Sequence, residues 1–195
     1  MLDEKQIAEY RQDIQFTSSL CNQTLLFSTT WGIFSPREID AGTLLLMKYV
    51  KINPDDDCFD LGCGYGPIGL TMAKLAPNGQ TLLVDKDFMA VEYSNKNAAN
   101  NNIQNAKAIL SNGFQHIDKK LRFDVIASNV PAKVGKEMMS LMLHDAHKAM
   151  KTDGRLYLVT VNGLRQNMKR NLKEIFGNYK KVKQGKAYTI HLAYK

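Results

Sequence analysis

The stretch DLGCGYG, from Asp60 to Gly66, combines a carboxylate with three alternating glycines. It follows the apolar run at 58–63 and precedes PIGLTMAKLA at 67–76, so we place it between a buried strand and a helix. Glycines in such a loop adopt positive φ and bring backbone N–H groups close to a ligand at the helix N-terminus. The stretch therefore predicts a site for a nucleotide-like cofactor.

Two cofactor classes compete for this loop. Gly64, Gly66 and Gly69 satisfy the dinucleotide spacing G-x-G-x-x-G. Asp60 argues against a dinucleotide, because a carboxylate at the strand end repels a pyrophosphate but suits a ligand that carries an ammonium group. S-adenosylmethionine carries an ammonium and a sulfonium and no phosphate. Charge at this position therefore favours S-adenosylmethionine.

A second acid follows at a fitting distance. Asp85 closes the segment QTLLVD at 80–85 and stands 21 residues after Gly64. In nucleotide-binding α/β folds, a carboxylate at about this spacing meets the ribose hydroxyls. Asp87 begins the next helical segment, and we expect it only to cap that helix.

This arrangement of glycine loop, strand and terminal acid resembles the class I, seven-stranded S-adenosylmethionine-dependent methyltransferases. The resemblance implies cofactor contacts at the ends of the first three strands, made by Asp60, Gly62, Gly64, Gly66, Asp85 and Asn112. It also implies that Asn112 meets the adenine, a position at which Asp is common in the family.

The segment GIFSPREIDAGTLLL at 32–46 carries a second resemblance. It is similar to the G-[VI]-F-S…D-x-G-[ST]-x-L-L stretch of the small-domain methyltransferases, which include 16S rRNA guanine-N2 enzymes and short single-domain members. There the segment closes over the methionine end of the cofactor and borders the acceptor pocket. The resemblance thus implies cofactor roles for Asp40 and Thr43 and a substrate role for Phe34. In physical terms, Asp40 also suits the N-cap of a helix beginning near Ala41, and Phe34 also suits a core position, as does Trp31.

The stretch SNVPAKVG at 128–135 follows a buried-type strand, so Asn129 is expected at the strand end, facing the same crevice as Asp60. It is similar to the N-P-P-aromatic motif of enzymes that methylate planar nitrogens. In those enzymes the Asn side-chain carbonyl and the next backbone carbonyl accept hydrogen bonds from the target NH₂. Catalysis is then mainly positioning. The resemblance implies catalytic roles for Asn129, Val130 and Pro131.

Two positions depart from that motif. Val130 keeps a backbone carbonyl but lacks the fixed φ of proline, whereas Pro131 still holds Val130 extended. Ala132 borders the substrate and loses the base stacking of an aromatic, worth ~1–3 kcal/mol. Phe34 or Trp31 could replace that stack. We interpret the site as a variant that remains competent, with a binding-only descendant or a turn without function as the alternatives.

The distribution of charged residues along the chain indicates which kind of macromolecule the protein binds. Residues 133–195 hold 14 Lys+Arg and 4 Asp+Glu (net +10), and residues 1–132 hold 12 and 15 (net −3), which together give the net charge of +7. This asymmetry favours RNA, with solubility alone as the alternative explanation. The expected phosphate contacts are Lys133, Lys136, Arg165, Lys169 and Arg170.

The predicted function is methyl transfer to an exocyclic amino nitrogen, most specifically guanine N2 in ribosomal RNA. Three alternatives remain: a protein or small-molecule amine methyltransferase, a catalytically impaired protein that binds cofactor and RNA, and a nucleotide-dependent dehydrogenase. Salt-sensitive RNA binding would favour an RNA enzyme over a small-molecule enzyme.

The elements that position these residues alternate along the chain. We expect strands at 58–63, 80–85, 107–111, 123–128, 155–161 and 187–194, and helices at 67–76, 87–102, 135–151 and 164–176. This pattern is typical of an α/β, Rossmann-like fold with a mostly parallel sheet covered on both faces, and the resemblance implies seven strands. Ahead of it we expect a hairpin or extended segment at 24–34 and a helix at 37–50. One domain is expected over 1–195, with an N-terminal extension at 1–50 and a catalytic core at 51–195.

Composition sets the remaining limits. The chain is 44% hydrophobic and 23% charged, without an apolar run of the roughly 20 residues needed to cross a bilayer. Its polar N-terminus is unlike a signal peptide, so we expect a cytoplasmic protein. Three cysteines without a C-x-x-C pair indicate reduced thiols, and neither they nor the four histidines predict a metal site.

Overall fold

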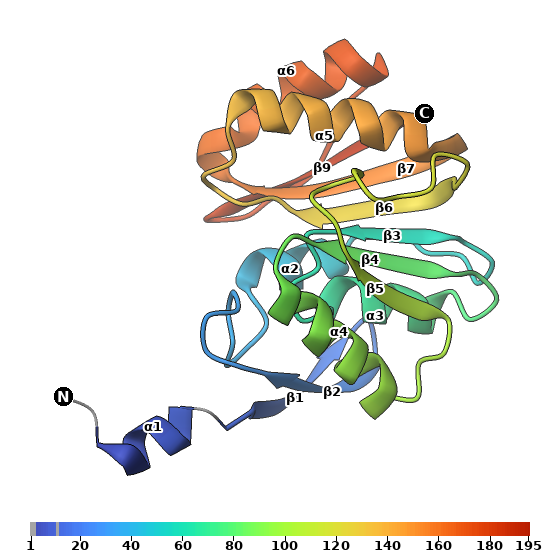
Figure 1. Cartoon of the computed structure of the whole chain (residues 1–195). Coiled ribbons are helices and arrows are strands. Elements are labelled where there is room, and N and C mark those ends of the chain that lie inside the picture. The colour runs from blue at the N-terminus through green and yellow to red at the C-terminus, as the bar shows by residue number, and fades with distance from the viewer. Residues whose placement is uncertain (1–2, 11) are drawn as a thin grey trace.

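The computed structural model describes residues 3–10 and 12–195. A seven-stranded sheet of order β5-β4-β3-β6-β7-β9-β8 forms its centre (Figure 1). Its strands are β3 (Cys58–Leu61), β4 (Thr81–Asp85), β5 (Ala106–Leu110), β6 (Phe123–Asn129), β7 (Met150–Val161), β8 (Lys180–Gln184) and β9 (Tyr188–Tyr194). The strands from β5 to β7 are parallel, and β9 runs antiparallel to both β7 and β8. The predicted seven-stranded, mostly parallel α/β fold is confirmed.

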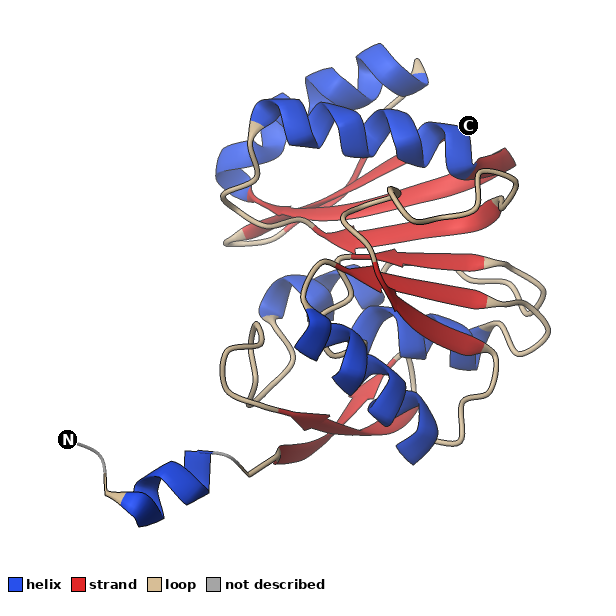
Figure 2. Ribbon diagram, in the orientation of Figure 1, coloured by secondary structure: helices blue, strands red, loops and turns tan. Residues whose placement is uncertain are grey.

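Helices cover both faces of this sheet (Figure 2). One face carries α2 (Ala41–Met47), α3 (Pro67–Leu75) and α4 (Phe88–Asn100), and the other carries α5 (Lys136–Ala149) and α6 (Arg165–Phe176). Each face has its own apolar core. Leu46, Leu70 and Leu83 are buried in the first core, and Leu143 and Leu172 are buried in the second.

Several local signals produce the helix ends that they predict. Asp87 caps α4 by accepting a hydrogen bond from the Met89 backbone N–H (2.8 Å). Pro67 occupies the first turn of α3. Gly177 ends α6 with φ of 70°, a left-handed conformation that glycine adopts without a Cβ penalty.

The N-terminal region differs from its prediction. The hairpin consists of β1 (Ile14–Leu20) and β2 (Gln23–Thr29), so its first strand begins ten residues before the expected segment at 24–34. Cys21 and Asn22 form the two-residue turn with φ of 51° and 62°, the positive values of a type I′ turn. The short α1 (Glu4–Tyr10) was not predicted and has no buried residue.

Three other boundaries also differ. The expected helix at 37–50 shrinks to α2, because Asp40 caps its N-terminus and the preceding residues form a turn in which the Ser35 hydroxyl donates to the Glu38 carbonyl (2.7 Å). The strand expected from 155 starts at Met150, and Asp153 takes a positive φ of 62° within it. The edge strand β8 was not predicted because its sequence, KKVKQ, contains one apolar residue; lysines at an edge oppose pairing with another chain.

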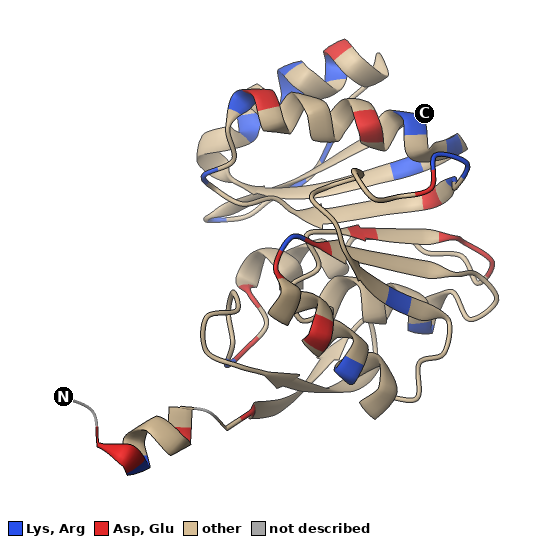
Figure 3. Cartoon of the chain, viewed as in Figure 1, with Lys and Arg blue, Asp and Glu red and all other residues tan. Residues whose placement is uncertain are grey.

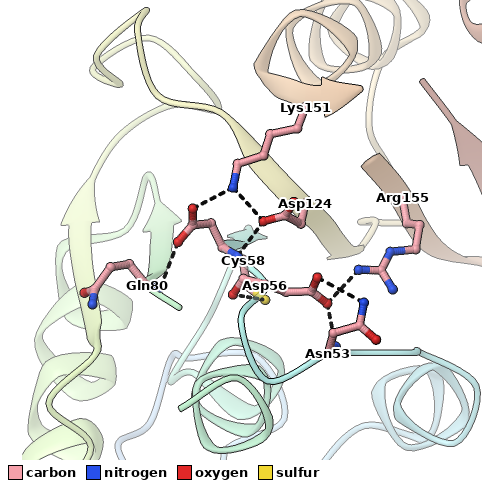
Figure 4. Close-up of polar contacts among 8 residues, drawn as sticks. Asn53, Asp56, Cys58, Gln80, Asp124, Lys151 and Arg155 are labelled. Atoms are coloured by element: carbon pink, nitrogen blue, oxygen red, sulfur yellow. Dashed lines mark hydrogen bonds and ion pairs between the residues drawn. The ribbon is translucent and has the colours of Figure 1, made fainter. Parts of the chain in front are cut away.

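An ion-pair cluster ties together the amino ends of the central strands (Figure 4). The Lys151 ammonium lies 2.8 Å from a carboxylate oxygen of both Asp57 and Asp124. Arg155 lies 2.6 Å from Asp56, whose side chain is only 7% exposed. These contacts link β3, β6 and β7 at the edge opposite their carboxyl ends.

Within the described residues, no helix is both long enough and apolar enough to span a bilayer. The same residues hold no group of three His, Cys, Asp or Glu side chains that could bind a metal ion.

Candidate active site

The strand order changes direction at β3, because β4 continues to one side of it and β6 lies on the other. A ligand in such a sheet binds outside the carboxyl ends of the strands at this switch point. Register pairs Asp60 with Leu83 of β4 and with Ala127 of β6. Asp85 and Asn129 each lie two residues further along, so they flank the glycine loop from opposite sides.

Asp60 is completely buried at the end of β3. One of its carboxylate oxygens accepts a hydrogen bond from the Gly69 N–H (2.7 Å), and the other has no partner among the described residues. Burial is the main cause that raises the pKa of this carboxyl to about 7; the Gly69 N–H lowers the pKa and the charge of Asp85 raises it further. An unpaired buried oxygen beside the loop can accept a hydrogen bond from a bound cation.

The glycines of the loop fit a ligand that approaches the backbone. Gly62, Gly64 and Gly66 have φ of 78°, 56° and 95°. A Cβ added at Gly62 or Gly64 would meet nothing within 4 Å, so the loop is open where a ligand would pass. Gly69 is needed for packing instead, because a Cβ there would lie 2.4 Å from the Leu83 side chain.

Asp85 lies against the same loop. Its carboxylate accepts from the Gly64 N–H (2.9 Å) and from the Asp87 N–H (3.0 Å). A carboxylate offers about four acceptor positions, so two remain for hydroxyl groups. Two acids and an open glycine loop match a ligand with cationic groups and ribose hydroxyls better than one with a pyrophosphate.

Asn129 is joined to the segment that precedes the loop. Its side-chain Nδ2 donates to Oδ2 of Asp40 (2.8 Å) and to Oγ1 of Thr43 (3.1 Å). Asp40 is the N-cap of α2, as one interpretation of the sequence predicted, and accepts from the backbone N–H groups of Gly42 (2.8 Å) and Thr43 (3.3 Å). The structure therefore brings Asp40 and Thr43 to Asn129, a link that sequence analysis missed because the residues lie 89 and 86 positions apart.

Val130 contributes its backbone to the site and its side chain to the core. The side chain is 4% exposed, and the backbone N–H donates to the Val159 carbonyl (3.0 Å). Among the described residues, no donor is bonded to the Val130 carbonyl or to the Asn129 side-chain carbonyl. Pro131 and Ala132, which follow, are exposed.

The aromatics before α2 are not core residues, so that interpretation of Trp31 and Phe34 is wrong. Ile33, between them, is the buried residue. Trp31 is 40% exposed, with the Arg37 guanidinium 4.6 Å from its ring centre and Tyr10 packed edge-on at 5.8 Å. Phe34 is 68% exposed and has no aromatic partner among the described residues. Phe34 is thus the aromatic that remains free to stack on a ligand.

The remaining predicted residues follow the carboxyl ends of β5, β6 and β7, at the edge of the sheet where Asp60 and Asn129 lie. Asn112 follows β5 and is exposed. Lys133 lies in the loop after β6, and α6, which follows β7, carries Arg165 and Lys169. The Arg165 guanidinium donates to the Gln184 side chain (2.6 Å), which places it beside the turn between β8 and β9. Their roles as ligand contacts stay predictions.

The chain matches the family model of the methyltransferase small domain over residues 24–192. It belongs to this family. The assignment confirms the resemblance drawn from the glycine loop and the segment at 32–46, and it excludes the dehydrogenase alternative. The family uses S-adenosylmethionine, so the expected cofactor is also confirmed.

Proteins of three bacteria are similar to this chain in sequence. The chain is 32% identical to YbxB of Bacillus subtilis, over 88% of this chain and 86% of the relative. It is 30% identical to ribosomal RNA large subunit methyltransferase G of Shewanella amazonensis, over 84% of this chain and 44% of the relative. It is 33% identical to ribosomal RNA small subunit methyltransferase C of Actinobacillus succinogenes, over 66% of this chain and 39% of the relative. The chain thus spans less than half the length of the two ribosomal RNA methyltransferases.

A solved structure has a closely similar fold. The 16S rRNA N2 G1207 methyltransferase RsmC of T. thermophilus, in complex with AdoMet and guanosine, superposes with a TM-score of 0.85. The match covers 94% of this chain and 50% of that chain at 24% identity. At this identity the likeness establishes the fold, which agrees with the strand order described above.

Proposed function

We propose that this methyltransferase acts on an exocyclic amino nitrogen of a nucleobase in RNA, most specifically N2 of guanine in ribosomal RNA. The observation that carries the proposal is the state of Asn129. Both hydrogens of its amide NH₂ are donated within the protein, to Asp40 and Thr43. The carbonyl oxygen of the Asn129 side chain is therefore the polar atom that remains to bind the amino group of the substrate.

The site can hold a planar NH₂ group with two carbonyls. The Asn129 side-chain carbonyl accepts one N–H of the acceptor, and the backbone carbonyl of Val130 accepts the other. This arrangement directs the nitrogen lone pair toward the cofactor side of the crevice, and one amino proton leaves to solvent after transfer. Bound S-adenosylmethionine supplies the electrophilic methyl group, so positioning is the main contribution of the chain.

The cofactor is held on the other side of Asn129. We assign Asp60 to the cationic methionine end, because one of its oxygens is buried beside the loop and has no partner in residues 3–10 and 12–195. Gly62 and Gly64 leave the space over the loop open, and Asp85 accepts the ribose hydroxyls. This charge pattern supports a sulfonium cofactor at the loop.

The distribution of charge supports RNA as the acceptor. Acids outnumber cations at the β3–β4 half of the carboxyl edge, whereas cations outnumber acids around the half formed by β6, β7 and the β8–β9 turn (Figure 3). These cations are Lys133, Lys136, Arg165, Lys169, Lys183 and Lys186. None of them belongs to an ion pair among the described residues. Unpaired cations beside the acceptor position suit a phosphate backbone.

Two measurements test the proposal. The first is methyl transfer from labelled S-adenosylmethionine to unmodified ribosomal RNA and to isolated ribosomal subunits, with Asn129→Ala as the matched variant whose turnover is expected to be slow but measurable. The second maps the modified nucleotide by mass spectrometry in cells with and without the protein. We expect one methylated guanine that disappears with the protein. Methylation of a protein or of a small amine instead would favour the protein or small-molecule methyltransferase. Binding of cofactor and RNA without turnover would favour the catalytically impaired protein, and either result would overturn the proposal.

A further inference from the structure

The amide of Asn129 can serve an amino acceptor in only one orientation. When its carbonyl faces the substrate amino group, the amide accepts a hydrogen bond from one N–H of that group. With the amide turned by 180°, its NH₂ would face the NH₂ of the acceptor, and neither could accept. A site built on this residue therefore needs a device that fixes the amide.

Asp40 provides a strong constraint of this kind. Its Oδ2 accepts three N–H groups, from Gly42 (2.8 Å), Thr43 (3.3 Å) and the Asn129 amide (2.8 Å). A carboxylate in this role only accepts, so the reversed amide would bring two oxygens together. The second amide hydrogen goes to the Thr43 hydroxyl (3.1 Å), which leaves no free donor on the Asn129 side chain.

Asp40 is itself held in place from a distant strand. The Tyr188 hydroxyl, on β9, donates to Oδ1 of Asp40 (3.1 Å). Gly42 makes this packing possible, because a Cβ there would lie 2.8 Å from Oδ2 of Asp40 and 3.0 Å from the Tyr188 ring. Three segments, the start of α2, the end of β6 and the start of β9, thus converge on one amide.

We propose that Asp40, supported by Thr43 and Tyr188, is a positioning residue that fixes the Asn129 amide with its carbonyl toward the acceptor. This inference rests on the proposed function and goes beyond it by explaining selectivity. The fixed Asn129 amide and the Val130 carbonyl present acceptors to the substrate, and the amide has no free donor. The site therefore selects the amino-bearing edge of a base and rejects an oxo-bearing edge, which would bring carbonyl oxygens against carbonyl oxygens.

The test is a double-mutant cycle on methyl transfer to unmodified ribosomal RNA. Asp40→Asn keeps a side chain that caps helices as well as aspartate does, so the fold is expected to persist. We expect kcat to fall about 10- to 100-fold, because a charge-assisted hydrogen bond is lost, while cofactor affinity changes less than about threefold. In the Asn129→Ala background the same substitution should have no further effect on kcat, because no amide remains to be positioned. Tyr188→Phe should lower kcat by a smaller factor and show the same non-additivity.

The outcomes separate this inference from the proposed function. If Asn129→Ala turns over as fast as the unaltered protein, the role of Asn129 fails and the inference fails with it. If Asn129→Ala is impaired but Asp40→Asn is not, or if the two effects multiply, only the positioning role is wrong. If Asp40→Asn weakens cofactor binding more than tenfold at unchanged kcat, Asp40 belongs to the cofactor site, as the sequence pattern implied.

A measurement without any acceptor gives an independent readout. The side-chain amide hydrogens of Asn129, assigned in NMR spectra by their loss in Asn129→Ala, should exchange slowly with solvent and accelerate at least about tenfold in Asp40→Asn. Exchange at the rate of an exposed asparagine in the unaltered protein would overturn the proposal, because the bonds to Asp40 and Thr43 would then not persist.

Discussion

At the residue scale, the proposed function gives different roles to Asp60, near the end of β3, and to Asn129, the last residue of β6. Asp60 is buried with one oxygen that has no partner among the described residues, and Asn129 donates both hydrogens of its side-chain amide within the protein. The first residue is unsatisfied until a donor arrives, and the second can only accept. Each therefore favours a different partner, a cation at the loop and an amino group at the strand end.

The raised pKa of Asp60 predicts that cofactor binding is linked to proton release. A carboxyl with a pKa of about 7 is partly protonated in the free protein, and a bound cation favours its ionised form. Affinity for S-adenosylmethionine should therefore rise as the pH rises through about 7. Calorimetry at pH 6 and pH 8, each in two buffers of different ionisation enthalpy, measures both the affinity and the protons released. Asp60→Asn should bind about 10- to 100-fold more weakly and release no proton; an unchanged affinity would place the cationic end of the cofactor elsewhere.

Gly69 gives a prediction about packing around the same acid. An added Cβ would lie 2.4 Å from Leu83 and 2.9 Å from the Asp60 carboxylate, so Gly69→Ala forces α3 away from the sheet. We expect a loss of about 1–3 kcal/mol in the free energy of unfolding, measured by urea titration. Gly163→Ala is the control, because a Cβ there meets nothing within 4 Å. Equal effects of the two substitutions would contradict the close helix-to-strand contact.

At the element scale, the sequence predicted the elements whose signals are local. The strands from β3 to β6 and the helices α3 to α6 have apolar periodicity and end signals of their own, such as Asp87 and Gly177. The strand β8 lacks such a signal, since its pairing with β9 and not its apolar content makes it a strand. The hairpin strand β1 was missed although Ile14, Phe16 and Leu20 alternate with polar residues, because Ser18 interrupts the apolar side of that alternation.

The contact of β9 with its neighbours predicts a pH dependence of stability. His191 is completely buried, with Nε2 2.8 Å from the Thr160 hydroxyl and Nδ1 3.3 Å from the Tyr179 hydroxyl. Burial, followed by the charge of Arg165, lowers its pKa from 6.5 to about 4. As the pH falls below 6.5, the unfolded chain takes up this proton first, so the stability contribution is complete above pH 6.5 and is lost toward pH 4.

Between pH 6.5 and pH 4.5 this loss of stability amounts to about 2–3 kcal/mol, because one unit of pKa corresponds to about 1.4 kcal/mol. Urea unfolding at pH 7.5 and at pH 4.5 measures it. His191→Gln removes the titrating group, so the difference between the two pH values should shrink in this variant. An undiminished difference would assign the pH dependence to other groups.

At the scale of the whole molecule, the fold assembles a site that local sequence signals describe only in part. The glycine loop and Asp85 could be predicted from the sequence, because one helix and one strand fix their spacing along the chain. The bond from Asn129 to Asp40 was not readable, because it joins residues 89 positions apart and depends on the β3–β6 register. Tyr188 was not considered for the site, since nothing in its local sequence marks it, yet its hydroxyl reaches Asp40 across 148 positions.

The separation of charge across the carboxyl edge predicts which lysines bind RNA. The turn between β8 and β9 is fixed to the end of β7 by the Asn162 side chain, which donates to the carbonyls of Gly185 (3.2 Å) and Lys186 (2.9 Å). Gly185 also lies against α2, since a Cβ there would be 3.3 Å from Leu45. The exposed Lys183 and Lys186 are thereby held beside the element that carries Asp40.

Substituting these two lysines should reduce the salt dependence of RNA binding. Each phosphate contact contributes roughly 0.7–0.9 to the slope of log affinity against log salt, so Lys183→Gln with Lys186→Gln should reduce that slope by about 1.5. The matched control is Lys74→Gln with Lys107→Gln, which removes the same charge from α3 and β5 on the other half of the sheet. Filter binding of unmodified ribosomal RNA at several salt concentrations measures both slopes. Equal slopes for the two pairs would show that net charge alone, and not this surface, determines binding, whereas a smaller slope confined to the first pair places the RNA backbone over the β8–β9 turn.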